Sequence, residues 1–331
     1  MIAAIMKSIH WFVSMAPFTM REKSILADLK VSIGKELFEN PVWVASGTFG
    51  YGTEAPELVD VDRLGAIVTK SITRHPREGN PPPRIVETPS GMINSIGLAN
   101  IGVEKYIKDL LPIYEGLSTK VIMNIAGTDI QEYVEIIEMM ESVSSVLIGY
   151  EINISCPNVK KGGMEFGVDC DMTATLTEKL RDITERLIIM KLSPNVSDIV
   201  SIGVSAENAG ADAVSAINTV VGMSINAKTG MSDIYTNYGG LSGPAIKPVG
   251  LAAVHKLHQK LEIPIIGIGG IVSGEDTAEY MLAGATAVQV GTANFRNPGI
   301  TENIIDSLTR YLNESNRSSV TELIGKVHTY S

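Results

Sequence analysis

Apolar, β-branched runs recur along the chain, with stretches of helical pattern between them. The runs are nearly continuous rather than alternating, which is typical of strands buried on both faces of a parallel sheet. They cover residues 42–46, 66–70, 121–125, 149–154, 187–192, 213–218, 263–268 and 287–291. Eight such strands, each followed by room for a helix, predict an α/β fold of the (β/α)8 TIM-barrel type.

Three connections between these runs are long, namely residues 71–120, 155–175 and 219–245. Each begins where a predicted strand ends, and barrel enzymes carry their active sites at the C-terminal ends of the strands. Long loops in compact domains are usually functional or disordered, so we expect functional insertions on this face; the alternative is variable surface. Before the first strand, residues 31–41 are expected to form a short hairpin that closes the bottom of the barrel.

No linker divides the chain. We expect residues 1–28 to be a loosely ordered N-terminal extension and residues 29–331 to form one barrel domain. The apolar stretch Trp11-Phe12-Val13 is too short for an export signal. No apolar run approaches the roughly twenty residues that span a bilayer, so we expect no membrane partner.

Composition narrows the class of protein further. The 331 residues carry a net charge of −10 and no basic tract, which argues against nucleic acid as a partner. The only two cysteines, Cys156 and Cys170, cannot build a disulfide framework or a four-thiolate cluster, and a cytoplasmic location suits them. The five histidines show no metal-ligand spacing, so no metal site is expected.

Cys156 has the most informative surroundings in the sequence. It lies in Asn153-Ile154-Ser155-Cys156-Pro157-Asn158, directly after a predicted buried strand. A lone cysteine is more often a small buried hydrophobe than a chemical group. Here the strand end brings a thiol and two amides to one place, which favours a site that binds a planar polar ligand and moves a proton on it.

Polar residues also end several other apolar runs. They are Ser46, Lys70, Asn124, Asn153, Lys191 and the pair Asn218-Thr219. A lysine at the end of a buried strand requires an acceptor, so two of them indicate an anionic ligand or an electron-rich ring; the alternative is that each reaches to water. Carboxamides donate and accept hydrogen bonds. The amides of Asn94, Asn153, Asn158 and Asn218 therefore suit a ring with alternating C=O and N–H groups, such as a pyrimidine.

Glycine strings follow the last two predicted strands. Gly267-Ile268-Gly269-Gly270 ends one and Gly291-Thr292 ends the other. Barrels often bind phosphate with these two loops, because glycine lets backbone N–H groups approach an anion closely. The first string is not a dinucleotide motif, since Val272 stands where GxGxxG needs glycine. A mononucleotide phosphate is therefore favoured over NAD.

These strings together resemble the dihydroorotate dehydrogenase family, class 1, and within it the class 1B (NAD-dependent) catalytic subunit. The resemblance covers about residues 29–323. It is carried by the segments 45–52, 69–71, 79–84, 94–98, 153–158, 239–244 and 267–270. Thr48 departs from the pattern, because related 1B chains often have cysteine there.

The resemblance implies oxidation of (S)-dihydroorotate to orotate in de novo pyrimidine biosynthesis, with one FMN per chain. Cys156 would take the proton from C5, and the hydride would pass from C6 to the flavin. The residues implied to bind substrate are Lys70, Asn94, Ile96, Gly97, Leu98, Asn153, Asn158, Asn218 and Thr219. Those implied to bind FMN are Ala45, Ser46, Lys70, Asn124, Asn153, Lys191, Ile217, Gly243, Gly269, Gly270, Gly291 and Thr292.

The 1B pattern further implies that electrons reach NAD+ through a partner subunit with FAD and a [2Fe–2S] cluster. The assembly would be a homodimer of this chain with two such subunits. Three alternatives stay open at this point. They are a class 1A enzyme that reduces fumarate, another FMN barrel acting on a pyrimidine, and a barrel without enzymatic activity.

Overall fold

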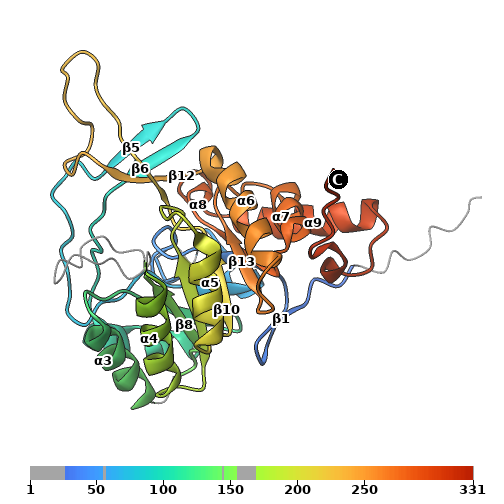
Figure 1. Ribbon diagram of the computed structural model, residues 1–331, viewed down its shortest axis with the longest axis horizontal. Coiled ribbons are helices and arrows are strands. Elements are labelled where there is room, and N and C mark those ends of the chain that lie inside the picture. The colour runs from blue at the N-terminus through green and yellow to red at the C-terminus, as the bar shows by residue number, and fades with distance from the viewer. Residues whose placement is uncertain (1–26, 55–56, 144, 155–168, 331) are drawn as a thin grey trace, which may run out of the picture.

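The computed structural model describes residues 27–54, 57–143, 145–154 and 169–330. Most of the expected N-terminal extension therefore lies outside the described residues, as do Cys156 and Asn158. Within the described part, one barrel carries helices on its outside and a small second sheet that stands away from it (Figure 1).

The central element is a closed barrel of parallel strands, in the order β3-β4-β7-β8-β9-β10-β13-β14. The strands are β3 (Val42–Val44), β4 (Ala66–Val68), β7 (Lys120–Ile125), β8 (Gly149–Asn153), β9 (Leu187–Leu192), β10 (Ala213–Ala216), β13 (Ile265–Ile268) and β14 (Ala287–Val290). Each lies within one of the predicted runs or extends it by one residue. The predicted (β/α)8 barrel is therefore confirmed.

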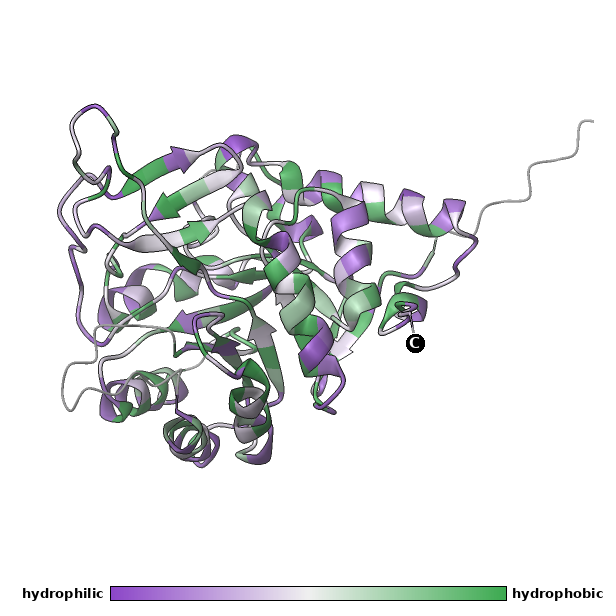
Figure 2. Cartoon of the chain, turned by 45° about the horizontal axis from the view of Figure 1, so that its top comes forward, coloured by the Kyte–Doolittle hydropathy of each residue, from purple (hydrophilic) through white to green (hydrophobic). Residues whose placement is uncertain are grey.

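Helices follow the strands and bury their apolar residues against the barrel (Figure 2). The longer ones are α1 (Val103–Asp109), α3 (Ile130–Glu141), α4 (Cys170–Arg181), α5 (Ile199–Asn208), α6 (Lys247–His258), α7 (Gly274–Ala283) and α9 (Ile300–Glu314). The shorter ones are α2 (Leu111–Tyr114), α8 (Ala293–Arg296) and the 3-10 turns η1 (Val61–Arg63), η3 (Pro244–Ile246) and η4 (Val320–Leu323).

Local sequence fixes several helix ends. The side chains of Asp129, Asp169 and Ser273 accept a hydrogen bond from the backbone of the first turn of α3, α4 and α7. Helix α7 stops at Gly284, whose φ of 119° suits a glycine C-cap. Because Asp169 caps α4, that helix already begins at Cys170, inside the stretch 155–175 that we expected to be a connection.

Strands β1 (Val31–Ile33) and β2 (Glu36–Phe38) form the expected antiparallel hairpin. Lys35 donates to the carbonyl of Glu185, and Glu36 pairs with Lys120 at 2.5 Å. Both partners lie where β9 and β7 begin, so the hairpin closes the N-terminal end of the barrel as predicted.

The sequence did not predict the antiparallel sheet that caps the other end. It has the order β11-β12-β6-β5 and is formed by β5 (Ile85–Thr88), β6 (Gly91–Asn94), β11 (Val220–Gly222) and β12 (Gly239–Ser242). Two of the long connections, 71–120 and 219–245, thus pair with each other. Gly240 lies opposite Asn94 in this sheet, which joins the insertions after the second and sixth barrel strands.

Helices long and apolar enough to cross a bilayer are absent from the part of the chain that the structure describes.

Candidate active site

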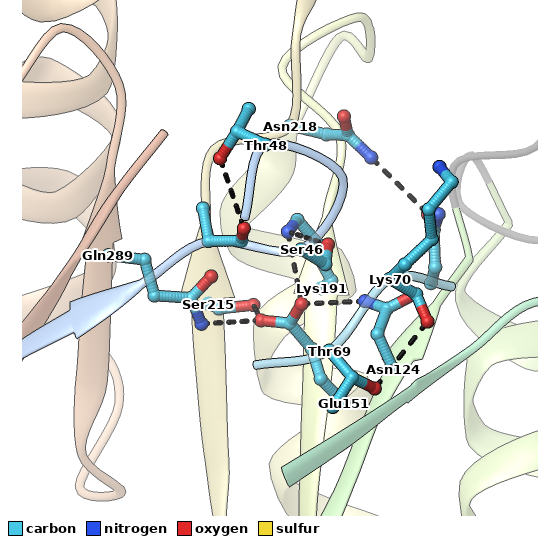
Figure 3. Close-up of polar contacts among 12 residues, drawn as sticks. Ser46, Thr48, Thr69, Lys70, Asn124, Glu151, Lys191, Ser215, Asn218 and Gln289 are labelled. Carbon is cyan, nitrogen blue, oxygen red and sulfur yellow. Dashed lines mark hydrogen bonds and ion pairs between the residues drawn. The ribbon is translucent and has the colours of Figure 1, made fainter. Parts of the chain in front are cut away.

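The polar residues that end the barrel strands gather at the C-terminal mouth. Asn124 pairs with Glu151 across β7 and β8, and Asn153 pairs with Lys191 across β8 and β9. Ser46 follows β3, and its hydroxyl accepts a hydrogen bond from Lys191 Nζ at 3.2 Å. The strands therefore bring the predicted flavin residues Ser46, Asn124 and Lys191 to one side of the mouth (Figure 3).

Lys191 already has a counter-charge within the protein. Its Nζ lies 3.0 Å from Glu151 Oε1, and both side chains are nearly or fully buried. Lys191 therefore has its acceptor inside the protein, so its charge alone does not require an anionic ligand, and its predicted place beside an electron-rich ring stays a prediction.

Lys70 differs from Lys191 in having no ion pair among the described residues. It follows β4, and its backbone N–H donates to the carbonyl of Gly50 at 2.8 Å. Burial lowers the pKa of the Lys70 ammonium. A desolvated, unpaired cation at the mouth is what an anionic ligand would stabilise.

Two amides at the mouth orient each other. Asn218 Nδ2 donates to Asn153 Oδ1 at 3.2 Å, and Asn218 Oδ1 accepts from the backbone N–H of Thr219 at 2.7 Å. The hydroxyl of Tyr133 donates to the carbonyl of Asn153 at 2.8 Å and fixes the end of β8. Figure 3 shows Asn218 and Lys70 at the same end of the cluster.

The second sheet brings further predicted substrate residues to this mouth. Asn94 Nδ2 donates to the carbonyl of Gly240 at 3.3 Å, and Thr219 packs directly against Gly240. A Cβ at position 240 would lie 2.0 Å from Thr219 Oγ1, so only glycine allows this approach. Asn94 and Thr219 thus meet across β12.

The segment that follows Asn94 is held in an unusual backbone conformation. Gly97 and Leu98 have φ values of 74° and 57°. Asn100 stabilises this turn, because its Nδ2 donates to the carbonyl of Leu98 at 2.7 Å and its Oδ1 accepts from the N–H of Gly102 at 2.8 Å. Asn100 was not among the predicted site residues, although it lies only two residues after Leu98.

The loops that carry the two predicted glycine strings pack closely against the loop that contains Gly243, and we call this group of glycines the cradle. Gly243, Gly269 and Gly270 have φ values of 93°, 127° and 70°. A Cβ on Gly270 would lie 2.9 Å from the carbonyl oxygen of Gly243, and one on Gly243 would lie 3.6 Å from Thr292 Cγ2. The loops after β12, β13 and β14 therefore lie close together, and their binding of a phosphate stays a prediction.

The remaining predicted flavin residues continue the same strands. Ala45 donates its N–H to the carbonyl of Val290 at 2.9 Å, and Ile217 donates to that of Ile268 at 3.0 Å. A Cβ on Gly291 would lie 3.7 Å from Ala45 Cβ, so these two residues face each other.

Three buried polar residues of the barrel interior were missed in the sequence. They are Glu151, Ser215 and Gln289, each with no exposed surface. Glu151 stands two positions before Asn153 on β8, so both side chains lie on the same face of the strand. An acidic residue inside an apolar strand, in phase with a predicted site residue, was the signal that could have found it.

Cys156 and Asn158 lie outside the described residues, so their predicted roles stay predictions. The described residues also contain no group of histidine, cysteine or acidic side chains close enough together to hold a metal ion.

The fold and its polar mouth place the chain among the (β/α)8 barrels that bind ligands at the C-terminal ends of their strands. A family model described as dihydroorotate dehydrogenase matches residues 28–312. The chain therefore belongs to the dihydroorotate dehydrogenase family.

Two relatives illustrate the likeness. A protein of Desulforamulus reducens is 48% identical over 301 residues, which are 91% of this chain and 99% of that protein. A protein of Bacteroides fragilis is 46% identical over 300 residues, again 91% and 99% of the two chains. Both are described as "Dihydroorotate dehydrogenase B (NAD(+)), catalytic subunit".

A solved structure of dihydroorotate dehydrogenase from Eimeria tenella in complex with ferulenol shares the fold. It has a TM-score of 0.75 and 23% identity, and the alignment covers 90% of this chain and 88% of the other.

Proposed function

We propose that this protein oxidises (S)-dihydroorotate to orotate in de novo pyrimidine biosynthesis and that its electrons reach NAD+ through a partner subunit. The observation that carries this proposal is Lys70, a half-buried lysine with no ion pair among the described residues, beside the mutually oriented amides of Asn153 and Asn218. A cation next to fixed carboxamides suits a planar ring that bears a carboxylate. Family membership then favours dihydroorotate among such ligands.

The residues present fit FMN as the cofactor. Asn124 Oδ1 is buried and has no hydrogen-bond partner among the described residues, and such an acceptor suits a ring N–H. The cradle of Gly243, Gly269 and Gly270 suits a phosphate, and Thr292 lies beside it. The other residues proposed to hold the cofactor are Ala45, Ser46, Lys70, Asn153, Lys191, Ile217 and Gly291. FMN, when bound, supplies the acceptor for the hydride that leaves C6.

Substrate would be held above this cofactor by Lys70 and the amides. Asn94, Ile96, Gly97, Leu98, Asn153, Asn158, Asn218 and Thr219 complete the proposed set. Cys156 is proposed to take the proton from C5. An ordinary thiol has a pKa of about 8.5, so its base strength and its ionisation are both usable close to neutral pH.

The partner proposal follows from what this chain cannot supply alone. Two cysteines are too few for a four-thiolate cluster, so FAD and a [2Fe–2S] cluster are proposed to lie on a separate electron-transfer subunit. We place the assembly in the cytoplasm, a location that the low cysteine content supports.

A homodimer of this chain is proposed as the core of that assembly. Large apolar side chains are exposed along β11 and the segment that follows it: Val221, Met223, Ile225, Met231, Tyr235 and Tyr238. Contiguous exposed apolar side chains usually mark a contact surface. This segment stands away from the barrel (Figure 1) and is suited to bury these residues against a second copy.

Co-expression of this chain with an electron-transfer flavoprotein encoded by a neighbouring gene tests the proposal. The purified complex should oxidise dihydroorotate with NAD+, and fumarate should not replace NAD+. Turnover with fumarate by this chain alone would instead indicate a class 1A enzyme. Flavin absorbance that responds to uracil but not to orotate would indicate a different pyrimidine substrate.

A further inference from the structure

Glu151 is a fully buried acid at the centre of the barrel, with 0% of its surface exposed. Four side chains from four other strands donate to its carboxylate. Asn124 Nδ2 and Lys191 Nζ donate to Oε1 at 2.7 and 3.0 Å, and Ser215 Oγ and Gln289 Nε2 donate to Oε2 at 3.0 and 2.6 Å. Figure 3 shows the carboxylate in the middle of this ring of donors.

The chemistry of the donors indicates that Glu151 is ionised. An ammonium group and the N–H₂ groups of two carboxamides can only donate hydrogen bonds. A protonated carboxyl group would have to place its own hydrogen against one of them or against Ser215. Four donors around two oxygens instead fill the acceptor sites of a carboxylate, and Lys191 neutralises its charge.

Two of the four donors are also proposed flavin residues. Lys191 Nζ bridges Glu151 and Ser46, which fixes the ammonium at the rim of the barrel. Asn124 turns its Nδ2 inward to Glu151, and its Oδ1 has no partner within the part of the chain that the structure describes. Glu151 thus determines where the positive charge of Lys191 lies and which atom of the Asn124 amide can serve a ligand.

We propose that Glu151 is a positioning residue that sets the reduction potential of the flavin. This inference rests on the proposed function, because it requires FMN at the mouth. The carboxylate holds Lys191 and Asn124 in place and offsets part of the positive charge that Lys191 presents. A reduced flavin carries added negative charge, and nearby protein charge tunes its stability. Removing the carboxylate should therefore favour the reduced flavin.

Glu151→Gln in the FMN-loaded protein tests this proposal, with reduction followed against a reference dye. The flavin should stay bound, and its equilibrium should shift toward the reduced form at least about tenfold, which corresponds to about 30 mV for a two-electron couple. Glu151→Asp keeps the charge and should stay within about threefold of the wild type. An unchanged potential in Glu151→Gln would overturn the proposal.

Glu141→Gln is a matched control at the opposite end of the barrel. Glu141 Oε1 accepts from Tyr150, Thr184 and Arg186 at 2.7, 2.8 and 3.1 Å. Its substitution also removes a carboxylate with several donors, so it should lower the melting temperature without moving the flavin potential. A potential shift equal to that of Glu151→Gln would mean that Glu151 acts only through general stability.

A comparison of the wild-type protein with Glu151→Asp covers the case in which Glu151→Gln does not fold. Infrared difference spectra between the oxidised and reduced flavin should show a perturbed carboxylate band that is absent from Glu151→Asp or shifted in it. A carbonyl band of a protonated carboxyl group that appears on reduction and moves in Glu151→Asp would overturn the proposal. Failure of the wild-type chain to bind FMN would instead refute the proposed function.

Discussion

Lys191→Met should be among the most destabilising single substitutions at the mouth. The Glu151 carboxylate would keep its donors from Asn124, Ser215 and Gln289 but lose the only cation that pairs with it among the described residues. Removing one partner of a buried ion pair costs about 3–5 kcal/mol, because the remaining charge stays buried and uncompensated.

The expected change in melting temperature follows from the size of the chain. Unfolding entropy of about 2.1 cal/mol/K per residue gives about 0.7 kcal/mol/K for a protein of this length. A loss of about 3–5 kcal/mol therefore lowers the melting temperature by about 4–7 °C. Differential scanning calorimetry of the protein without cofactor measures this change directly.

Two further variants isolate the buried pair. Lys191→Met combined with Glu151→Gln should lose less stability than the sum of the two single variants, by about 1–3 kcal/mol, because the stranded charge is gone. Lys30→Met is the control, since the exposed Lys30–Glu39 pair at 3.3 Å should contribute no more than about 1 kcal/mol. A Lys191→Met protein that melts within about one degree of the wild type, or strict additivity in the double variant, would refute this account of the buried pair.

Four other predictions address the site. Cys156→Ala should retain FMN and orotate binding but lose at least about 99% of turnover, because a general base contributes about 10²-fold or more. Cys156→Ser should keep some activity that rises with pH. Wild-type rates in Cys156→Ala would show that the thiol is not the base. Because burial lowers the pKa of Lys70, orotate affinity should fall as the pH rises through that lowered value. Flavin absorbance measures this affinity, and the Cys156→Ala background excludes titration of the thiol. Constant affinity up to pH about 10 would contradict an ionic role for Lys70. By the same shift, the protein without ligands should gain stability as pH rises from the lowered pKa to the ordinary value near about 10.4, since the unfolded chain binds more protons there. Gly270→Ala should weaken FMN binding at least about tenfold, because its Cβ would press on the Gly243 carbonyl. Gly230→Ala is the control, since Gly230 has a similar φ of 71° and a Cβ there would have no described atom within 4 Å. Equal FMN affinities in the two variants would contradict the cradle.

The barrel could be predicted from the sequence because its strands are buried on both faces. Leu187–Leu192 was predicted to the residue, and the other runs differ at their ends for local reasons. Strand β13 begins at Ile265 rather than at residue 263, because Pro264 has no N–H to give to the ladder.

The second sheet could not be predicted in the same way. Its strands are three or four residues long, and Gly239–Ser242 lacks the apolar alternation of a strand. The pairing of Gly240 with Asn94 joins residues far apart in the sequence, and only the closed barrel brings the two insertions together. Strand pairing of this kind depends on tertiary context rather than on local propensity.

The candidate site was predicted in outline but not in its electrostatics. Strand-end polar residues were visible one by one, and the structure brings Ser46, Asn124 and Lys191 together as expected. The partner of Lys191 was missed because Glu151 was counted within a mostly apolar run. A lysine at the end of a buried strand needs a counter-charge, so the presence of Lys191 itself predicts an acid in a neighbouring strand.

Anaerobic reaction of the FMN-loaded chain with (S)-dihydroorotate, without any partner subunit, tests the central claim most directly. We expect the absorbance of the bound flavin to bleach with the formation of one orotate per flavin. A chain that holds FMN in full occupancy and yet stays oxidised under excess dihydroorotate would contradict the account.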